Sequence, residues 1–307
     1  MLFPNPFPNL LTPGPAMRVA LTAALAQTGL TFPAERVHLD TAISIAAVIN
    51  PTSTSPRFAY AGFRDTEMHF SGSLLKAAAM FAAFQLRQSA SQHVLTAGDC
   101  TPSGVFNDLK SAFNQNIKNA APRFQTEPGI TENMRVPKYP TIFGPPEELA
   151  SGGCLISFSQ VFAANMRGMT VPSHNPETSA CIQALGYSWI NGLLAKTGLF
   201  NPSTNTGIWL AGTFTGAFPA VRVPSMNDGP SAQSTTTVDM ARLFALIVEG
   251  SILDSHSIDG IASDMRQLLA DAQSAGDSSW MTTGARQHIN GLGAGFTSPT
   301  ARSAWAA

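Results

Sequence analysis

The stretch that decides the fold reads Phe70-Ser71-Gly72-Ser73-Leu74-Leu75-Lys76-Ala77-Ala78-Ala79-Met80-Phe81-Ala82-Ala83-Phe84-Gln85-Leu86. From Ser73 onward it contains no Gly or Pro and is rich in Ala, Leu and Met, so it predicts a helix with Ser73 in its first turn. Residues three apart lie on one face of a helix, and the side chains of Ser73 and Lys76 can therefore meet.

This pair of residue types is typical of a nucleophilic serine and its base. A serine hydroxyl attacks a carbonyl poorly until a neighbouring base takes its proton. Lysine acts as that base only when its pKa falls, and the apolar residues after Lys76 offer the desolvated setting that lowers it. The alternative is a capping serine beside a solvated lysine. Against it, none of the other lysines has a serine three positions earlier; these are Lys110, Lys118, Lys138 and Lys196.

The composition limits the classes of partner. The chain has 307 residues, of which 12% are charged, and a net charge of −1, so it forms one large domain or two lobes. With so little charge we expect no nucleic-acid partner and no binding to a membrane surface. No apolar run approaches the length of a membrane span. The first eight residues lack the pattern of a secretory signal, and the compartment stays open.

The three cysteines, Cys100, Cys154 and Cys181, show no Cys-x-x-Cys pattern and no histidine at ligand spacing. We therefore expect no metal and no other cofactor. Cys100 and Cys154 flank a loop-rich segment and could form a disulfide in an oxidising compartment. Buried free thiols are the interpretation that we favour.

The elements before and after Ser73 follow from local signals. Residues 15–30 predict an amphipathic helix, and residues 43–49 and 57–63 predict the two strands of a hairpin. Residues 88–150 contain many Gly and Pro, and only 105–120 predict a helix there. This segment is an insertion or lid over a site, or a disordered or decorative loop.

Several further helices follow the loop-rich segment. Apolar periodicity predicts helices at 155–169, 187–197, 236–250 and 261–272, with short extended pieces between 198 and 234. The turn Ser173-His174-Asn175 opens one more helix, in which Asn175 suits the N-cap, Pro176 the first position and Gly186 the C-terminal cap. A capping sequence without further function is the alternative for this turn.

A helix that opens with Ser-x-x-Lys, followed about a hundred residues later by a Ser-x-Asn turn, resembles the serine β-lactamase and penicillin-binding-protein superfamily. The resemblance covers most of the chain and implies an α+β, β-lactamase/transpeptidase-like fold. In that fold an antiparallel sheet is flanked by helices and carries an inserted, mostly helical lobe. We expect the sheet lobe at 1–85 plus 240–307, and the helical lobe at 86–239 with the loop-rich insertion at 88–150.

The resemblance also implies a role for each site residue. Ser73 would attack an acyl carbonyl and neutral Lys76 would accept its proton. Ser173 would pass a proton to the leaving group, and Asn175 would bind the substrate's amide or hold Lys76. The backbone N–H of Ser73 would form half of an oxyanion hole.

The chain departs from the superfamily at its third motif, a Lys-Thr-Gly on an edge strand, because no lysine follows Lys196. Thr282, Thr283 and Gly284 are the first choice for that strand, and the rival is Ile289-Asn290-Gly291, or His288 with the glycines after it. Arg286 or His288 would supply the missing positive charge of this substrate-binding part. Only 23 residues follow Gly284, too few for the usual strands and helix, so the sheet is truncated or closes differently.

The commonest lactamase class also needs a glutamate after the second motif, and none occurs between Glu177 and Glu249. We therefore expect a serine hydrolase that forms an acyl-enzyme on a small ester, amide or peptide-like substrate. Two alternatives remain open. One is an inactive domain of the same fold with a binding role, and the other is a true β-lactamase or D,D-peptidase.

Overall fold

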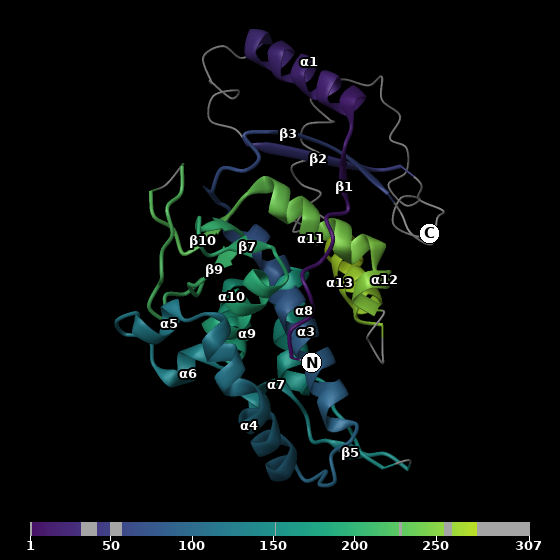
Figure 1. Cartoon of the computed structure of the whole chain (residues 1–307), viewed down its shortest axis with the longest axis vertical. Coiled ribbons are helices and arrows are strands. Elements are labelled where there is room, and N and C mark those ends of the chain that lie inside the picture. The colour runs from purple at the N-terminus through teal and green to yellow at the C-terminus, as the bar shows by residue number, and fades with distance from the viewer. Residues whose placement is uncertain are drawn as a thin grey trace.

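The helix predicted at Ser73 lies at the centre of the molecule. In the computed structural model, which describes residues 2–31, 42–49, 57–150, 152–226, 229–254 and 260–274, a 3₁₀ turn η1 (Gly72–Leu75) leads directly into α3 (Lys76–Val94). Nearly all of α3 is buried, and it packs against α8, α9, α10 and α13 (Figure 1). The run from Ala77 to Phe84 is apolar on every side, which suits a helix segment in such a core position.

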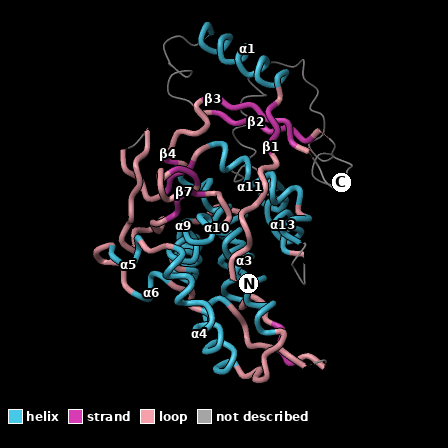
Figure 2. The backbone as a smooth tube through the Cα atoms, viewed as in Figure 1, coloured by secondary structure: helices cyan, strands magenta, loops and turns pink. Residues whose placement is uncertain are grey.

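The other helices of the core follow α3 in the chain. They are α4 (Pro102–Ala120), α8 (Gln160–Thr170), α9 (Asn175–Leu185), α10 (Tyr187–Lys196), α12 (Ser251–Asp254) and α13 (Ile261–Ser274). Short helical turns α5 (Arg123–Thr126), α6 (Glu132–Arg135) and α7 (Tyr139–Ile142) lie between α4 and α8 (Figure 2). The predicted helices form within a few residues of their expected bounds. The segment 88–150 is more regular than expected, because Phe124, Tyr139 and Ile142 pack into the core.

The larger sheet contains the predicted hairpin. Strands β2 (Ile43–Val48) and β3 (Phe58–Phe63) pair antiparallel, with Ile43 opposite Phe63. A third strand, β1 (Leu11–Pro13), pairs parallel to β3, so the order is β1-β3-β2 and this sheet is mixed rather than purely antiparallel. The pattern around β1 contains no alternation that would have predicted it, because the strand is only three residues long.

Two helices lie on opposite sides of this sheet (Figure 1). They are α1 (Pro15–Thr31) and α11 (Thr237–Glu249). Ala245 of α11 packs with Leu11 and Phe58 in a small core of its own. The start of α11 matches the sequence signal, since the Thr236 hydroxyl accepts a hydrogen bond of 3.1 Å from the backbone N–H of Asp239.

Several strands of two or three residues lie outside the β1-β3-β2 sheet. Strand β10 (Gln233–Thr235) pairs antiparallel with both β4 (His69–Phe70) and β9 (Trp209–Leu210). Two further two-residue pairs are β5 (Glu147–Glu148) with β6 (Cys154–Leu155), and β7 (Phe200–Asn201) with β8 (Thr206–Gly207). Because β4 ends at Phe70, the small β4-β10-β9 sheet determines where Ser73 lies.

The expectation of free thiols was wrong for Cys100 and Cys154. Cys100 and Cys154 form a disulfide, and Cys181 remains a buried free thiol. The chain between the first two folds back on itself, which brings their Cα atoms to 5.6 Å. That approach depends on the packing of the whole segment, so the spacing of the cysteines could not predict it.

The expected lobe boundaries both fall inside helices. The boundary at 85/86 lies within α3 and the boundary at 239/240 within α11. A large buried cluster runs from Met68 to Leu269, and the smaller one lies between α11 and the β1-β3-β2 sheet. Helix α11 therefore packs in both regions, whereas the buried apolar residues of α3 belong to the large cluster.

Candidate active site

The position of Ser73 is set by β4 and the turn after it. The backbone N–H of Ser71 donates to the carbonyl of Gln233 at 3.1 Å, which continues the β4–β10 pairing. Gly72 then adopts a φ of +51°, a left-handed conformation that favours glycine. The chain thereby turns from the strand into η1, and Ser73 lies in this 3₁₀ turn, directly before the helix that begins at Lys76.

Lys76 is 2% exposed, and its amine lies among oxygen atoms from the second motif. Its Nζ is 2.5 Å from the carbonyl oxygen of Ser173, 2.9 Å from the Ser173 hydroxyl and 2.9 Å from Asn175 Oδ1. These partners lie about a hundred residues away along the chain. The structure thus brings together three of the residues that the sequence proposed for the site.

Ser173 has an uncommon backbone conformation. Its φ is +61°, which few residues other than glycine adopt. In this conformation its carbonyl and its hydroxyl both reach the same amine. Strained backbone of this kind persists where the surrounding structure requires it, often at functional sites.

Asn175 does not have the capping role predicted from the sequence. The N-cap of α9 is His174, and Asn175 is the first helical residue. The prediction was wrong by one position because the Asn175 side-chain oxygen accepts from Lys76 and not from a backbone N–H of its own helix. The Gly186 cap of α9 forms as predicted, with a φ of +80°.

The surroundings of Lys76 lower its pKa and so increase the fraction of neutral amine. Burial lowers the pKa of Lys76 from 10.5 to about 8, because the ammonium loses its hydration, while the negative charge of Glu177 acts in the opposite direction. The Phe214 ring centroid lies 5.0 Å from Lys76 Nζ and covers the amine. Sequence reasoning missed both neighbours; Glu177, two residues after Asn175, could have been noticed, whereas nothing marked Phe214.

The Ser73 hydroxyl is half-buried and, within the part of the chain that the structure describes, has no hydrogen-bond partner. The hydrogen bonds of the Lys76 amine go to Ser173 and Asn175. Catalytic hydrogen bonds are often long or missing before substrate binds. The expected meeting of Ser73 and Lys76 stays a prediction, because Ser73 lies in the 3₁₀ turn just before Lys76 and no hydrogen bond joins the two side chains.

A shallow cavity of about 400 Å³ lies next to β4 and β10, and its lining does not include Ser73, Lys76, Ser173 or Asn175. Its lining includes Phe70, which precedes the Ser71-Gly72 turn, and Thr213, which is adjacent to Phe214. Arg222, whose side chain is exposed, is the cationic residue of the lining. The cavity thus has room for a small molecule at the end of β4, three residues before Ser73 in the chain.

The predicted third motif falls in the C-terminal part of the chain. Thr282, Thr283, Gly284, Arg286 and His288 lie outside the described residues, as does the rival at 289–291. In the described ranges, no group of three or more His, Cys, Asp or Glu side chains is placed to bind a metal ion. The same ranges contain no helix with the length and apolar character that crossing a bilayer requires.

Comparison of the chain with models of protein families, with curated proteins and with solved structures found no match. The assignment of a function therefore rests on the geometry around Lys76.

Proposed function

We propose that the protein is a serine hydrolase of the β-lactamase-like type, which forms a covalent acyl-enzyme on a small ester, amide or peptide-like substrate. The observation that carries the proposal is the buried Lys76 amine, hydrogen-bonded to Ser173 and to Asn175. An isolated buried ammonium is costly, so a fold keeps a lysine in such a place when partners and function both use it.

In the first half-reaction, the Ser73 hydroxyl oxygen attacks the carbonyl carbon of the substrate and its proton passes to the neutral Lys76 amine. The developing oxyanion accepts a hydrogen bond from the Ser73 backbone N–H, which lies in the first turn of the helix and has no acceptor within it. The bond from the carbonyl carbon to the leaving oxygen or nitrogen then breaks. The Ser173 hydroxyl transfers the proton from Lys76 to that leaving atom.

In the second half-reaction, water attacks the ester formed on Ser73. Lys76 is again the base that takes the proton of the water. The bond between the acyl carbon and the Ser73 oxygen then breaks, the carboxylic acid leaves, and Ser173 transfers the proton from Lys76 to the Ser73 oxygen. Asn175 holds the Lys76 amine through both steps. This scheme uses no glutamate for deacylation, in keeping with the sequence between Glu177 and Glu249.

The missing hydrogen bond between Ser73 and Lys76 favours one alternative, an inactive domain of the same fold with a binding role. The two functions differ in whether Ser73 reacts. We expect a fluorophosphonate probe to form one adduct on Ser73, detected by intact mass and peptide mapping, and expect Ser73→Ala and Lys76→Ala to abolish it. Ser111→Ala and Lys110→Ala are matched controls on α4 and should label normally.

A fluorescent penicillin separates the remaining kinds of enzyme. A Ser73 adduct with penicillin would favour a true β-lactamase or D,D-peptidase. Ester turnover without such an adduct would favour an esterase. If neither probe labels Ser73 in folded protein, the hydrolase proposal is wrong and the binding role remains.

A further inference from the structure

The shallow cavity at the end of β4, called the β4 cavity below, is built on three segments of chain that backbone hydrogen bonds join together. The N–H of Ala211 donates to the carbonyl of Ala232 at 2.8 Å, and the N–H of Val221 donates to the carbonyl of Ala211 at 2.9 Å. Val223 and Ser231 exchange two such bonds, of 2.9 and 2.8 Å. The cavity therefore belongs to the hydrogen-bonded part of the fold.

The hollow exists because three residues of its lining are small. Gly212 lies close to Ala220 and Ala232: a Cβ at Gly212 would be 2.8 Å from the Cβ of Ala232 and 3.8 Å from that of Ala220. Phe70, whose side chain is 43% exposed, adds an aromatic surface to the same lining. These residues offer a ligand an apolar surface without polar groups to satisfy.

Arg222 adds a positive charge to this apolar lining. Val221 and Val223 are fully buried whereas Arg222, between them, is exposed, and side chains of an extended segment alternate between its two faces. The Arg222 side chain therefore lies on the same face as Ala220, which also lines the cavity. Within the described ranges the Arg222 guanidinium makes no ion pair or hydrogen bond, and none of the described lining residues is acidic.

Phe70 connects the β4 cavity with Ser73. Its ring lies against Gly72, where a Cβ would be 3.6 Å from the ring. Phe70 and Ser73 are three residues apart, which fixes their separation at no more than about 11 Å even for an extended chain. The turn at Gly72 shortens that separation. A short acyl chain bonded to the Ser73 oxygen can therefore reach the cavity.

The cavity also approaches Lys76 through the residue after Thr213. Thr213 lines the cavity, and the ring centroid of Phe214 is 5.0 Å from Lys76 Nζ. Ser173 does not line the cavity. In the proposed reaction the leaving atom must face Ser173, because Ser173 gives it a proton. The part of the substrate that extends toward the β4 cavity is therefore the acyl part.

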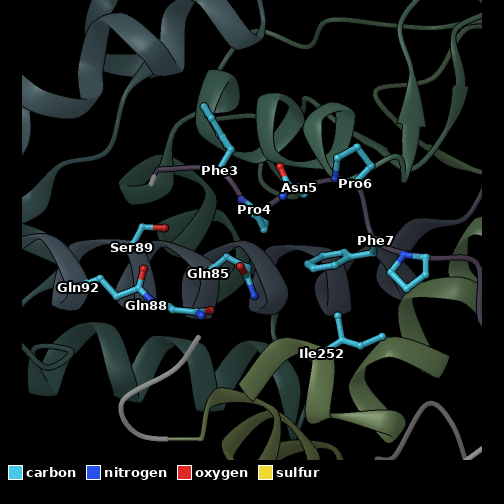
Figure 3. Close-up of a pocket in the computed structure, with 11 residues that line it drawn as sticks. Phe3, Pro4, Asn5, Pro6, Phe7, Gln85, Gln88, Ser89, Gln92 and Ile252 are labelled. Carbon is cyan, nitrogen blue, oxygen red and sulfur yellow. The ribbon is translucent and has the colours of Figure 1, made fainter. Parts of the chain in front are cut away.

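A larger cavity of about 490 Å³ lies elsewhere, between α3 and the N-terminal arm of residues 3–8 (Figure 3). Of the α3 residues that line it, Gln85 is the first in the chain. Gln85 comes nine residues after Lys76, which is about 13 Å along a helix. A short acyl chain on Ser73 would not reach that cavity, which leaves the β4 cavity for this role.

We infer that the β4 cavity binds the acyl part of the substrate and favours acyl chains that end in a carboxylate. The inference rests on the proposed function, since it assigns the acyl side of the same reaction. The hydrocarbon part of the chain packs against Phe70 and the small residues. The carboxylate pairs with Arg222, because a guanidinium can donate two parallel hydrogen bonds to the two oxygens of a carboxylate.

The test compares two substrates of the full chain that differ in one charge. One is the nitrophenyl half-ester of adipic acid, whose acyl chain ends in a free carboxylate, and the other is the methyl ester of that compound. The value of kcat/KM is measured for both at neutral pH, where the free carboxyl group is ionised. The half-ester should have a kcat/KM about fivefold higher, as expected for an ion pair at an exposed arginine.

Two variants test whether Arg222 causes this preference. Arg222→Gln should bring the ratio of the two kcat/KM values to about one. Ala220→Glu places a carboxylate at an exposed residue of the lining, so it should bring the ratio below one by repelling the half-ester. Arg18→Gln removes a charge from an exposed arginine of α1 and should keep the original ratio. Circular dichroism confirms that each variant is folded.

Fluorophosphonate labelling of Ser73 separates this inference from the proposed function. If Ser73 is labelled but the unchanged protein hydrolyses the half-ester no better than the methyl ester, the inference is wrong and the hydrolase proposal stands. A preference that persists in both folded variants has the same consequence. If Ser73 is not labelled and neither ester is hydrolysed, both proposals are wrong.

Discussion

The protonation of Lys76 is expected to control how fast Ser73 reacts. Burial lowers the pKa of Lys76 from 10.5 to about 8, and only the neutral amine can take the proton of Ser73. At pH 7, about one Lys76 in eleven is then neutral, against roughly one in 3,000 for an ordinary lysine. The rate of Ser73 labelling should therefore rise about tenfold from pH 6 to pH 7 and become constant above about pH 9.

The assay is the pseudo-first-order rate of fluorophosphonate labelling, followed by intact mass between pH 6 and pH 10. Glu177→Gln removes the negative charge that raises the pKa of Lys76, so the inflection of the rate profile should move to lower pH. Glu147→Gln makes the same change in charge at an exposed residue of β5 and should leave the inflection in place. A rate that is constant from pH 6 to pH 9, or an inflection near 10.5, would refute the assignment of Lys76 as the base.

Three further predictions concern the second motif and stability. Ser173→Ala should lower turnover of a nitrophenyl ester by roughly 10²–10⁴-fold, because the proton transfer is lost. Ser111→Ala is the control and should keep full activity. Similar turnover rates in the two variants would show that Ser173 takes no part in the mechanism. Reduction of the Cys100–Cys154 disulfide, which spans a sequence separation of 54, should lower the free energy of unfolding by about 4 kcal/mol. Urea denaturation measures this change. An unchanged urea midpoint would show that the disulfide does not stabilise the fold. Thr236→Ala removes the N-cap of α11 and should lower the free energy of unfolding by about 1 kcal/mol in the same measurement. Thr126→Ala changes an exposed threonine and should lower it by less. Equal decreases in the two variants would argue against a stabilising cap at Thr236.

Local signals predicted much of the secondary structure because each depends on residues close together in the chain. The helix after Ser73 follows from a run without Gly or Pro, and the Thr236–Asp239 cap from a four-residue pattern. The β2–β3 hairpin likewise joins neighbouring strands, and its pairing needs only a short connection.

The predicted features that failed all depend on distant residues. The parallel pairing of β1 with β3 joins residues almost fifty positions apart, and the Cys100–Cys154 bond spans 54. Asn175 was displaced from its expected capping position because a lysine on another helix takes its side-chain oxygen. The local pattern favoured a backbone N–H of α9 as the partner of the Asn175 side chain, whereas tertiary packing placed the Lys76 amine there.

By itself, the sequence determined that Ser73 and Lys76 share one turn of a helix, since helical spacing alone puts residues three apart on one face. It also placed Ser173 and Asn175 in the turn that opens α9. Only the tertiary structure decided that this turn lies against Lys76 and that Phe214 covers the amine. The left-handed backbone conformation of Ser173 is also visible only in the structure. The pKa of Lys76 near 8 follows from that burial. Desolvation depends on every segment packed around a group, and no stretch of sequence contains that information on its own.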